Sequence, residues 1–147
     1  LNYIQKKIMD INYHIYGSTK YLEKNGYPKS INDLNKHKFI SYGKGAPSPV
    51  FNPDWALRLG MKDNKKRKPI LKVNSVYGLL LAVQSGVGIA ALPDYITVSV
   101  PNIVKVLPNV EGPKTEAYFV YPESLKNMAR LKVFRNFLYS KVSEWKF

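Results

Sequence analysis

The segment Ser85–Pro93, with the sequence SGVGIAALP, constrains the fold more than any other part of the chain. Gly86 ends a preceding helical pattern, and Gly88 permits a tight turn. Ile89–Leu92 is a continuous apolar run, which is typical of a strand in a parallel sheet covered on both faces. Pro93 then ends the strand. These residues predict a helix that turns directly into a buried strand, the basic unit of an α/β fold.

The helix before this turn has an amphipathic pattern. Asn74 and Ser75 can both cap its N-terminus, and Leu81 and Ala82 make its second side apolar as well. A helix with two apolar faces is normally covered on two sides, by its own sheet and by a partner subunit. The apolar positions that follow the spacing i, i+3, i+4 and i+7 are Val76, Leu79, Leu80 and Val83.

The rest of the chain alternates between strand and helix patterns. This alternation predicts an α/β fold with a mainly parallel sheet flanked by helices. We expect Ser18, Ser30 and Asp94 to cap short helices, with Asp33 completing a capping box. Further helices are expected over 19–25, 31–37 and 125–145, and strands over 11–16, 39–42, 55–59, 70–73, 103–107 and 117–121.

Composition limits the class of protein. The 147 residues suffice for one domain or two small lobes, and no apolar run reaches the roughly 18 residues of a membrane span. Zero cysteines exclude disulfides and thiol catalysis and fit a reducing compartment, so we expect a cytoplasmic location. The chain starts at Leu1 without a signal-peptide pattern, so we expect a fragment of a longer protein.

The formal net charge of +13 would attract polyanions. The densest cluster of positive charge is Lys62–Lys68 (KDNKKRK). It precedes Pro69, so we expect it at the tip of a loop. Two interpretations stay open, a solvated turn and a contact with nucleic acid.

Catalysis and metal binding find little support in the sequence. Neither a GxSxG nor a GxxxxGK motif occurs, and the ten acidic residues are scattered without an obvious pair. The two histidines, His14 and His37, have no partner at metal-ligand spacing, and His37 lies at a helix end where a positive charge suits the dipole. We expect a protein that is not an enzyme and needs no metal or cofactor.

An ordered set of segments resembles the effector-binding region of a LysR-type transcriptional regulator. No single motif is specific, but the order and spacing cover nearly the whole chain. The segments are GSTKYLEKNGYPKSINDLNKHKFISYG (Gly17–Gly43), VNSVYGLLLAVQSGVGIAALPDYI (Val73–Ile96), VKVLPNV, AYFVYP and the closing helix.

The resemblance implies a fold of the type II periplasmic-binding-protein kind, with two lobes and two strand crossovers. Residues 1–11 would end the first lobe, 12–117 would form the effector-binding second lobe, and 118–147 would return to the first lobe as a strand and a C-terminal helix. The family's winged helix-turn-helix would be absent, so DNA would be bound only through that missing domain. The hinge would include His14, Ile15, Tyr16 and Tyr118.

Ligands of α/β folds bind beyond the carboxyl ends of parallel strands, and the family places its effector in the cleft there. A small anion would gain from the free N–H groups at the next helix and from Lys44 or Lys72. The alternatives are that Asn74 and Ser75 are only caps and that the lysines are only solvated. The candidate effector-binding residues are Ser41, Tyr42, Gly43, Asn74, Ser75 and Val76.

The same resemblance implies a homo-oligomer, because the family pairs its lobes through a helix at this place. The expected interface residues are Val76, Leu79, Leu80 and Val83, and Tyr77 fits a ligand contact or an interface equally well. The sequence therefore predicts a small-molecule sensor of a LysR-type regulator. A solute-binding receptor of the same superfamily and a basic nucleic-acid-binding module are the alternatives.

Overall fold

The computed structural model describes residues 2–43 and 52–145, which divide into two compact units. Unit 1 comprises residues 1–11 and 114–147, and unit 2 comprises residues 12–113. The chain therefore passes between the units twice, after Ile11 and after Pro113. Within the described residues, no helix has the length and apolar character needed to cross a bilayer.

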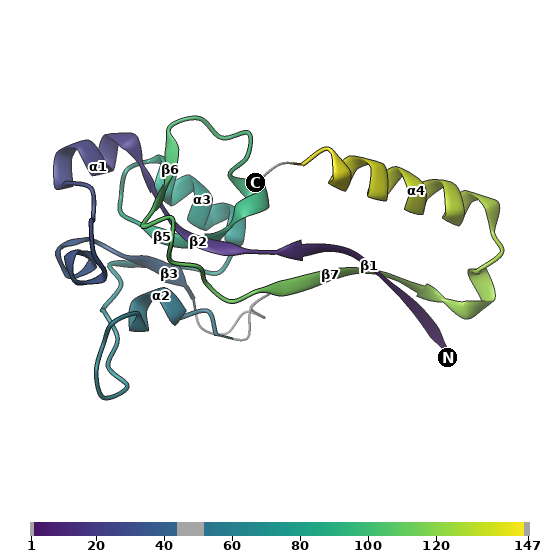
Figure 1. Ribbon diagram of the computed structural model, residues 1–147, viewed down its shortest axis with the longest axis horizontal. Helices are drawn as coiled ribbons and strands as arrows, with labels where there is room; N and C mark the ends of the chain where they lie inside the picture. The colour runs from purple at the N-terminus through teal and green to yellow at the C-terminus, as the bar shows by residue number, and fades with distance from the viewer. Residues whose placement is uncertain (1, 44–51, 146–147) are drawn as a thin grey trace. The chain divides into compact units, whose positions relative to one another are not determined.

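Unit 1 is built on two long strands and one helix. Strand β1 (Tyr3–Ile11) pairs antiparallel with β7 (Thr115–Pro122), with an irregularity between Lys7 and Met9. The short helix η3 (Glu123–Leu125) and helix α4 (Ala129–Ser143) follow β7 (Figure 1). The Tyr139 hydroxyl of α4 donates a hydrogen bond to the Lys7 carbonyl oxygen over 3.0 Å, which ties α4 to β1.

Helix α4 buries none of its residues fully. Val133 is 68% exposed, and Phe134 and Phe137 are about half exposed. The apolar stripe that the sequence predicts is therefore present, but within this chain it is covered only in part.

Unit 2 contains the main sheet. Its strand β2 (Tyr13–Ser18) lies between β5 (Ala90–Pro93) and β6 (Ile103–Val106) and is antiparallel to both. Strand β3 (Ile40–Tyr42) pairs parallel with β4 (Leu71–Val73). A parallel bridge between Phe39 and Ile89 links β3 to β5, so β3, β4, β5 and β6 run in one direction and β2 runs in the other.

The expectation of a mainly parallel sheet is thus right for the strand directions and wrong for the two ladders of β2. An apolar run such as Ile89–Leu92 shows that a strand is covered on both faces, but it does not show which way the neighbouring strand runs.

The predicted helix caps are present in unit 2. Ser18 caps α1 (Thr19–Asn25) by accepting a hydrogen bond from Tyr21 N, and Gly26 follows the helix with φ +88°. Ser30 and Asp33 form the capping box of the short helix η1 (Ile31–Lys36). Ser75 caps α3 (Val76–Gln84) by accepting from Gly78 N.

The structure corrects one predicted strand. Residues 55–59 were expected as a strand, but Trp55–Arg58 form the short helix α2. Ala56 and Leu57 are its buried residues. Four or five residues without alternation do not distinguish a strand from one helical turn, and burial against neighbouring elements decides between them.

The predicted helix cap at Asp94 is wrong. Asp94 is the first residue of the short helix η2 (Asp94–Ile96), and its side chain does not cap this helix. Its carboxylate is buried and accepts hydrogen bonds from the Tyr16 hydroxyl (2.8 Å) and the Lys105 ammonium group (3.3 Å). His14 Nδ1 lies 2.8 Å from the same carboxylate. Burial raises the pKa of Tyr16, so this hydroxyl remains a donor. These contacts of the Asp94 carboxylate connect η2 to β2 and β6.

The predicted hinge residues lie in strand ladders of the two units, and their role as a hinge stays a prediction. Ile15 and Tyr16 are paired with β5 on one side and β6 on the other, and His14 is paired with Leu92 and bonded to Asp94. Tyr118 is paired with Lys7 in the ladder of unit 1. Ala117, expected in the second lobe, is likewise paired with Met9 of β1.

Apolar side chains cover both faces of the β2 sheet in two clusters. Ile15 belongs to the first and Tyr16 to the second, as the alternation of a strand requires. The first cluster also contains Leu22, Leu34, Phe39, Leu57 and Ile89, and the second contains Ile40, Leu79, Leu80, Val83 and Leu92.

This arrangement corrects the predicted dimer interface. Leu79, Leu80 and Val83 of α3 are at most 4% exposed and pack on the sheet of their own chain. Tyr77 and Leu81, with exposed fractions of 66% and 45%, form the outer apolar face of α3.

Candidate functional site

The structure brings together the two segments that the sequence analysis selected as a binding site. Tyr42 pairs with Val73 in the parallel ladder, and Gly43 N donates to the Val73 carbonyl oxygen over 2.8 Å. A Cβ atom on Gly43 would lie 3.6 Å from Asn74 N. The end of β3 and the start of α3 are therefore direct neighbours.

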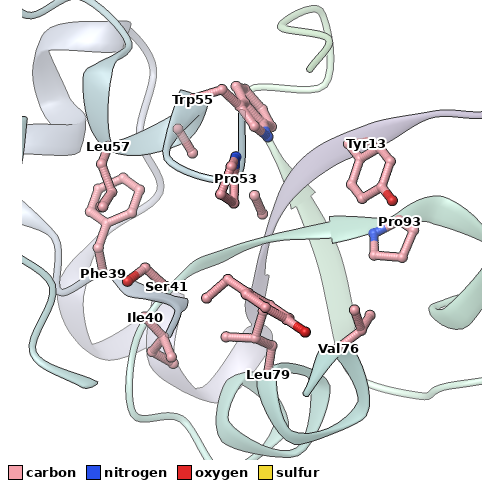
Figure 2. Close-up of a pocket in the computed structure, with 13 residues that line it drawn as sticks. Tyr13, Phe39, Ile40, Ser41, Pro53, Trp55, Leu57, Val76, Leu79 and Pro93 are labelled. Carbon is pink, nitrogen blue, oxygen red and sulfur yellow. The ribbon is translucent and has the colours of Figure 1, made fainter. Parts of the chain in front are cut away.

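A cavity opens beside this junction, and we call it the apolar cavity (Figure 2). Ser41, Tyr42 and Val76 of the predicted site line it, whereas Gly43, Asn74 and Ser75 do not. Trp55 and Pro53 lie on one side and Val76 and Leu79 on the other. The remaining lining residues are Tyr13, Phe39, Ile40, Ala56, Leu57, Ala91 and Pro93.

A second hollow shares Ser41, Tyr42 and Leu57 with the apolar cavity. We call it the basic hollow because Lys66 and Lys72 line it, together with Asp54 and Pro69. The Lys66 ammonium group lies 2.6 Å from the Asp54 carboxylate. Among the described residues Lys72 forms no ion pair, so its charge is available to a ligand. Lys44, the other predicted cation, lies outside the described residues.

The hydroxyl groups of Ser41 and Ser75 differ in their hydrogen bonding. Ser41 is 6% exposed, and within the described part of the chain its hydroxyl has no hydrogen-bond partner. Ser75 is exposed, and its hydroxyl oxygen accepts the 3.2 Å bond from Gly78 N. Its role as a cap is therefore observed, and a role in ligand binding stays a prediction.

Sequence reasoning missed the contribution of α2 to the cavity. Trp55 Nε1 is buried and has no hydrogen-bond partner in the described structure. The indole ring lies against Gly112, where a Cβ atom would be 2.5 Å from Trp55 Cζ2. The only signal in the sequence was a tryptophan shortly after a proline, which does not identify a cavity wall.

The basic cluster Lys62–Lys68 is a loop tip, as expected, with Asp63 and Asn64 both at φ +56°. The one arginine of this cluster, Arg67, is buried instead. Arg67 is 9% exposed, and Lys66 is paired with Asp54. Only the lysines at 62, 65 and 68 remain as free surface charge of this cluster in the described structure, which weakens the nucleic-acid interpretation.

His37 packs as a structural residue at the end of η1. Burial lowers the pKa of His37, and within the described residues its Nδ1 atom has no hydrogen-bond partner. The ring packs at 5.7 Å from the Tyr21 ring, so His37 is a neutral packing residue. Among the described residues, no group of three or more His, Cys, Asp or Glu side chains could hold a metal ion.

Two solved structures with a similar fold are named as regulatory domains. The regulatory domain of CrgA from Neisseria meningitidis, a LysR-type regulator, has a TM-score of 0.76 at 22% identity and covers 95% of this chain and 69% of that one. The regulatory domain of AphB from Vibrio vulnificus has a TM-score of 0.63 at 18% identity and covers 93% of this chain and 70% of that one. At these identities the likeness establishes the fold.

Sequence comparison establishes the family. The model of the LysR substrate binding domain matches residues 2–143, so the chain belongs to the LysR substrate-binding domain family. An uncharacterized HTH-type transcriptional regulator of Haemophilus influenzae is 31% identical over 123 residues, or 81% of this chain. The match spans 41% of that relative's length.

Proposed function

We propose that this chain is the effector-sensing part of a LysR-type transcriptional regulator and that a small molecule binds at the junction of β3 and α3. The observation that carries the proposal is the cavity beside Ser41, Tyr42 and Val76, next to the capped N-terminus of α3. Ser41 is a mostly buried residue, and its hydroxyl has no hydrogen-bond partner within the described residues. A group of this kind is available to a ligand, because a buried polar group gains from any partner that it acquires.

We further propose that the effector carries a negative charge. The N-terminus of α3 offers backbone N–H groups with a favourable helix dipole, and Lys72 adds a positive charge in the basic hollow. The anionic group would lie at the rim, between Ser41 and Lys72, where it keeps part of its hydration.

Two substitutions test the site. We expect Ser41→Ala to weaken effector binding about tenfold, because one hydrogen bond to a charged ligand is lost. We expect Ser75→Asp to weaken it by a similar or larger factor, since aspartate keeps the helix cap but repels an anion. Thermal shift across a panel of metabolites identifies a ligand, and calorimetric titration of that ligand gives the affinities.

Ser75→Thr is the matched control, because threonine also caps a helix and adds no charge. Its affinity should match the wild-type value. Unchanged affinity in both Ser41→Ala and Ser75→Asp would contradict this location of the site.

For the whole protein we propose a cytoplasmic, non-enzymatic regulator that reads DNA through a separate domain. An effector would act by binding one conformation of the regulator more tightly than another. We keep the proposal that units 1 and 2 belong to the two lobes of the sensor. Their described residues show where the passages between them lie, at Ile11–Asn12 and Pro113–Lys114.

We also propose that copies of the chain associate through the outer face of α3. The buried residues of α3 cannot take part, so the contact would use Tyr77 and Leu81. The double substitution Tyr77→Glu and Leu81→Glu should lower the mass measured by light scattering at high concentration. Changing Tyr27, which is 53% exposed on another part of unit 2, to Glu is the control and should leave the mass unchanged. A wild-type chain that is monomeric at every concentration would refute this assembly.

A further inference from the structure

We infer that the Asp54 side chain occupies the anion position of the basic hollow and that a carboxylate ligand binds there by displacing Asp54 from Lys66. This inference rests on the proposed function, since it concerns the charged end of the same ligand. It adds Lys66 to the residues that bind the ligand and makes Asp54 an internal competitor of the effector.

The Asp54 carboxylate is placed as the carboxylate of a ligand would be. It lies 2.6 Å from the Lys66 ammonium group, and both side chains line the basic hollow together with Lys72. Ser41 pairs with Lys72 in the parallel ladder of β3 and β4, so these two side chains lie on the same face of the sheet. The hollow therefore offers a carboxylate two lysine side chains and a hydroxyl group, and Asp54 already uses one of the lysines.

Helix capping does not explain the position of the Asp54 side chain. Asp54 is the N-cap residue of α2, where the side chain of an aspartate normally accepts a bond from a backbone N–H group. Here the side chain makes no such bond, and it accepts a hydrogen bond from the Lys66 ammonium group instead. The ion pair thus joins the start of α2 to the loop that follows this helix.

The backbone next to Lys66 is fixed independently of Asp54. Arg67 N donates to the Leu57 carbonyl oxygen over 2.9 Å, and the buried Arg67 guanidinium group donates to carbonyl groups of α2. Opening the ion pair therefore requires only side-chain rotations. The exposed fractions are 38% for the Lys66 side chain and 25% for that of Asp54. Because a partly exposed ion pair adds little net stability, a ligand anion can replace Asp54 at small cost.

The size of the basic hollow also favours displacement. Its free volume is about 40 Å³, which is room for a few water molecules. A second carboxylate beside Asp54 would meet a like charge at short range, which is unfavourable. The ligand carboxylate and the Asp54 carboxylate therefore exclude each other from the hollow.

Formate tests the inference, because it consists of the carboxylate group that Asp54→Ala removes. Asp54→Ala vacates the position of this group, whereas Asp54→Asn keeps its volume and removes its charge. Formate is titrated into the isotope-labelled chain at constant ionic strength, and the backbone amide NMR signals of Ser41 and Lys72 report the affinity. We expect formate to bind Asp54→Ala about fivefold more tightly than wild type, with a smaller gain for Asp54→Asn.

Two further variants separate the ion pair from the total charge. Asp63→Asn is the matched control for Asp54→Asn, because it removes the same charge from an exposed position on the same loop. Its affinity for formate should equal that of wild type. Lys66→Gln in the Asp54→Ala chain removes the cation, so the gain in affinity should disappear. Urea unfolding curves of every variant verify that the fold is retained.

The outcomes distinguish this inference from the proposal beneath it. Saturable formate binding at Ser41 and Lys72 that tightens in neither Asp54 variant overturns the inference and leaves the sensor proposal standing. An equal gain in Asp63→Asn, or a gain that survives Lys66→Gln, also overturns it, because the effect would then come from net charge alone. No saturable shift at these residues in any variant overturns the inference and the proposed anion site together.

Discussion

Replacing Arg67 with methionine is expected to destabilise unit 2 by about 3 kcal/mol. Its Nη1 atom donates to the Leu59 carbonyl oxygen over 2.7 Å, and Nε donates to Asn35 Oδ1 over 2.8 Å. Nη2 donates to the Ile31 carbonyl oxygen over 3.4 Å, and the guanidinium carbon lies 5.6 Å from the centre of the Phe39 ring. Methionine fills a similar volume without donors, so these acceptors lose their partner in a largely buried place.

Urea denaturation followed by circular dichroism measures this effect. Arg58→Met is the matched control, because Arg58 is exposed and donates only to the Asn64 carbonyl oxygen at the loop tip within the described residues. The urea midpoint of Arg58→Met should stay close to the wild-type midpoint. Arg67→Lys keeps the charge but not the planar set of donors, so its stability should lie between those of wild type and Arg67→Met. Equal effects of Arg67→Met and Arg58→Met would show that the buried network is unimportant.

Asp94→Ala should have an equally large effect, about 3 to 5 kcal/mol. The substitution leaves the Tyr16 hydroxyl, His14 Nδ1 and the Lys105 ammonium group without their common acceptor between β2, η2 and β6. Removing one partner of a buried ion pair destabilises a protein by more than the intact pair stabilises it, because the remaining partner stays buried without a compensating charge.

The free energy of unfolding, again from urea titration, provides the test. Glu23→Ala in α1 is the control, since that carboxylate is exposed. Tyr16→Phe removes one donor and leaves the carboxylate with its other partners, so it should destabilise by about 1 kcal/mol. If Asp94→Ala were no more damaging than Glu23→Ala, the three-way contact would carry no stability.

Features determined by neighbouring residues were predictable from the sequence. Ser18, Ser30 and Ser75 cap helices because their side chains reach backbone groups three residues away, and Gly86 follows α3 at φ +75°. The closeness of the end of β3 to the start of α3 was also predictable, because the carboxyl ends of neighbouring parallel strands lie at the same edge of a sheet.

Features determined by distant contacts were not predictable in this way. Nothing local distinguishes Arg67 from the lysines beside it, yet among the described residues of this cluster only Arg67 is buried, with its guanidinium group donating to carbonyl groups of α2. Asp94 has the sequence position of a helix cap, but its carboxylate is hydrogen-bonded to the Tyr16 hydroxyl and the His14 ring of β2 instead. The spacing in α3 identified an apolar face correctly, and only the three-dimensional packing showed that this face covers its own sheet.

The order of the strands along the chain has a consequence for biosynthesis. Strand β2 pairs with β5 and β6, and β1 pairs with β7, so each of these early strands of the sequence pairs with strands far along the chain. Sequence-distant pairings of this kind close large loops and slow folding. During synthesis β2 therefore lacks its first partner strand until Pro93 has been made and its second until Val106, and β1 lacks its partner until Pro122. During that interval these two segments are the natural targets of chaperones and of aggregation.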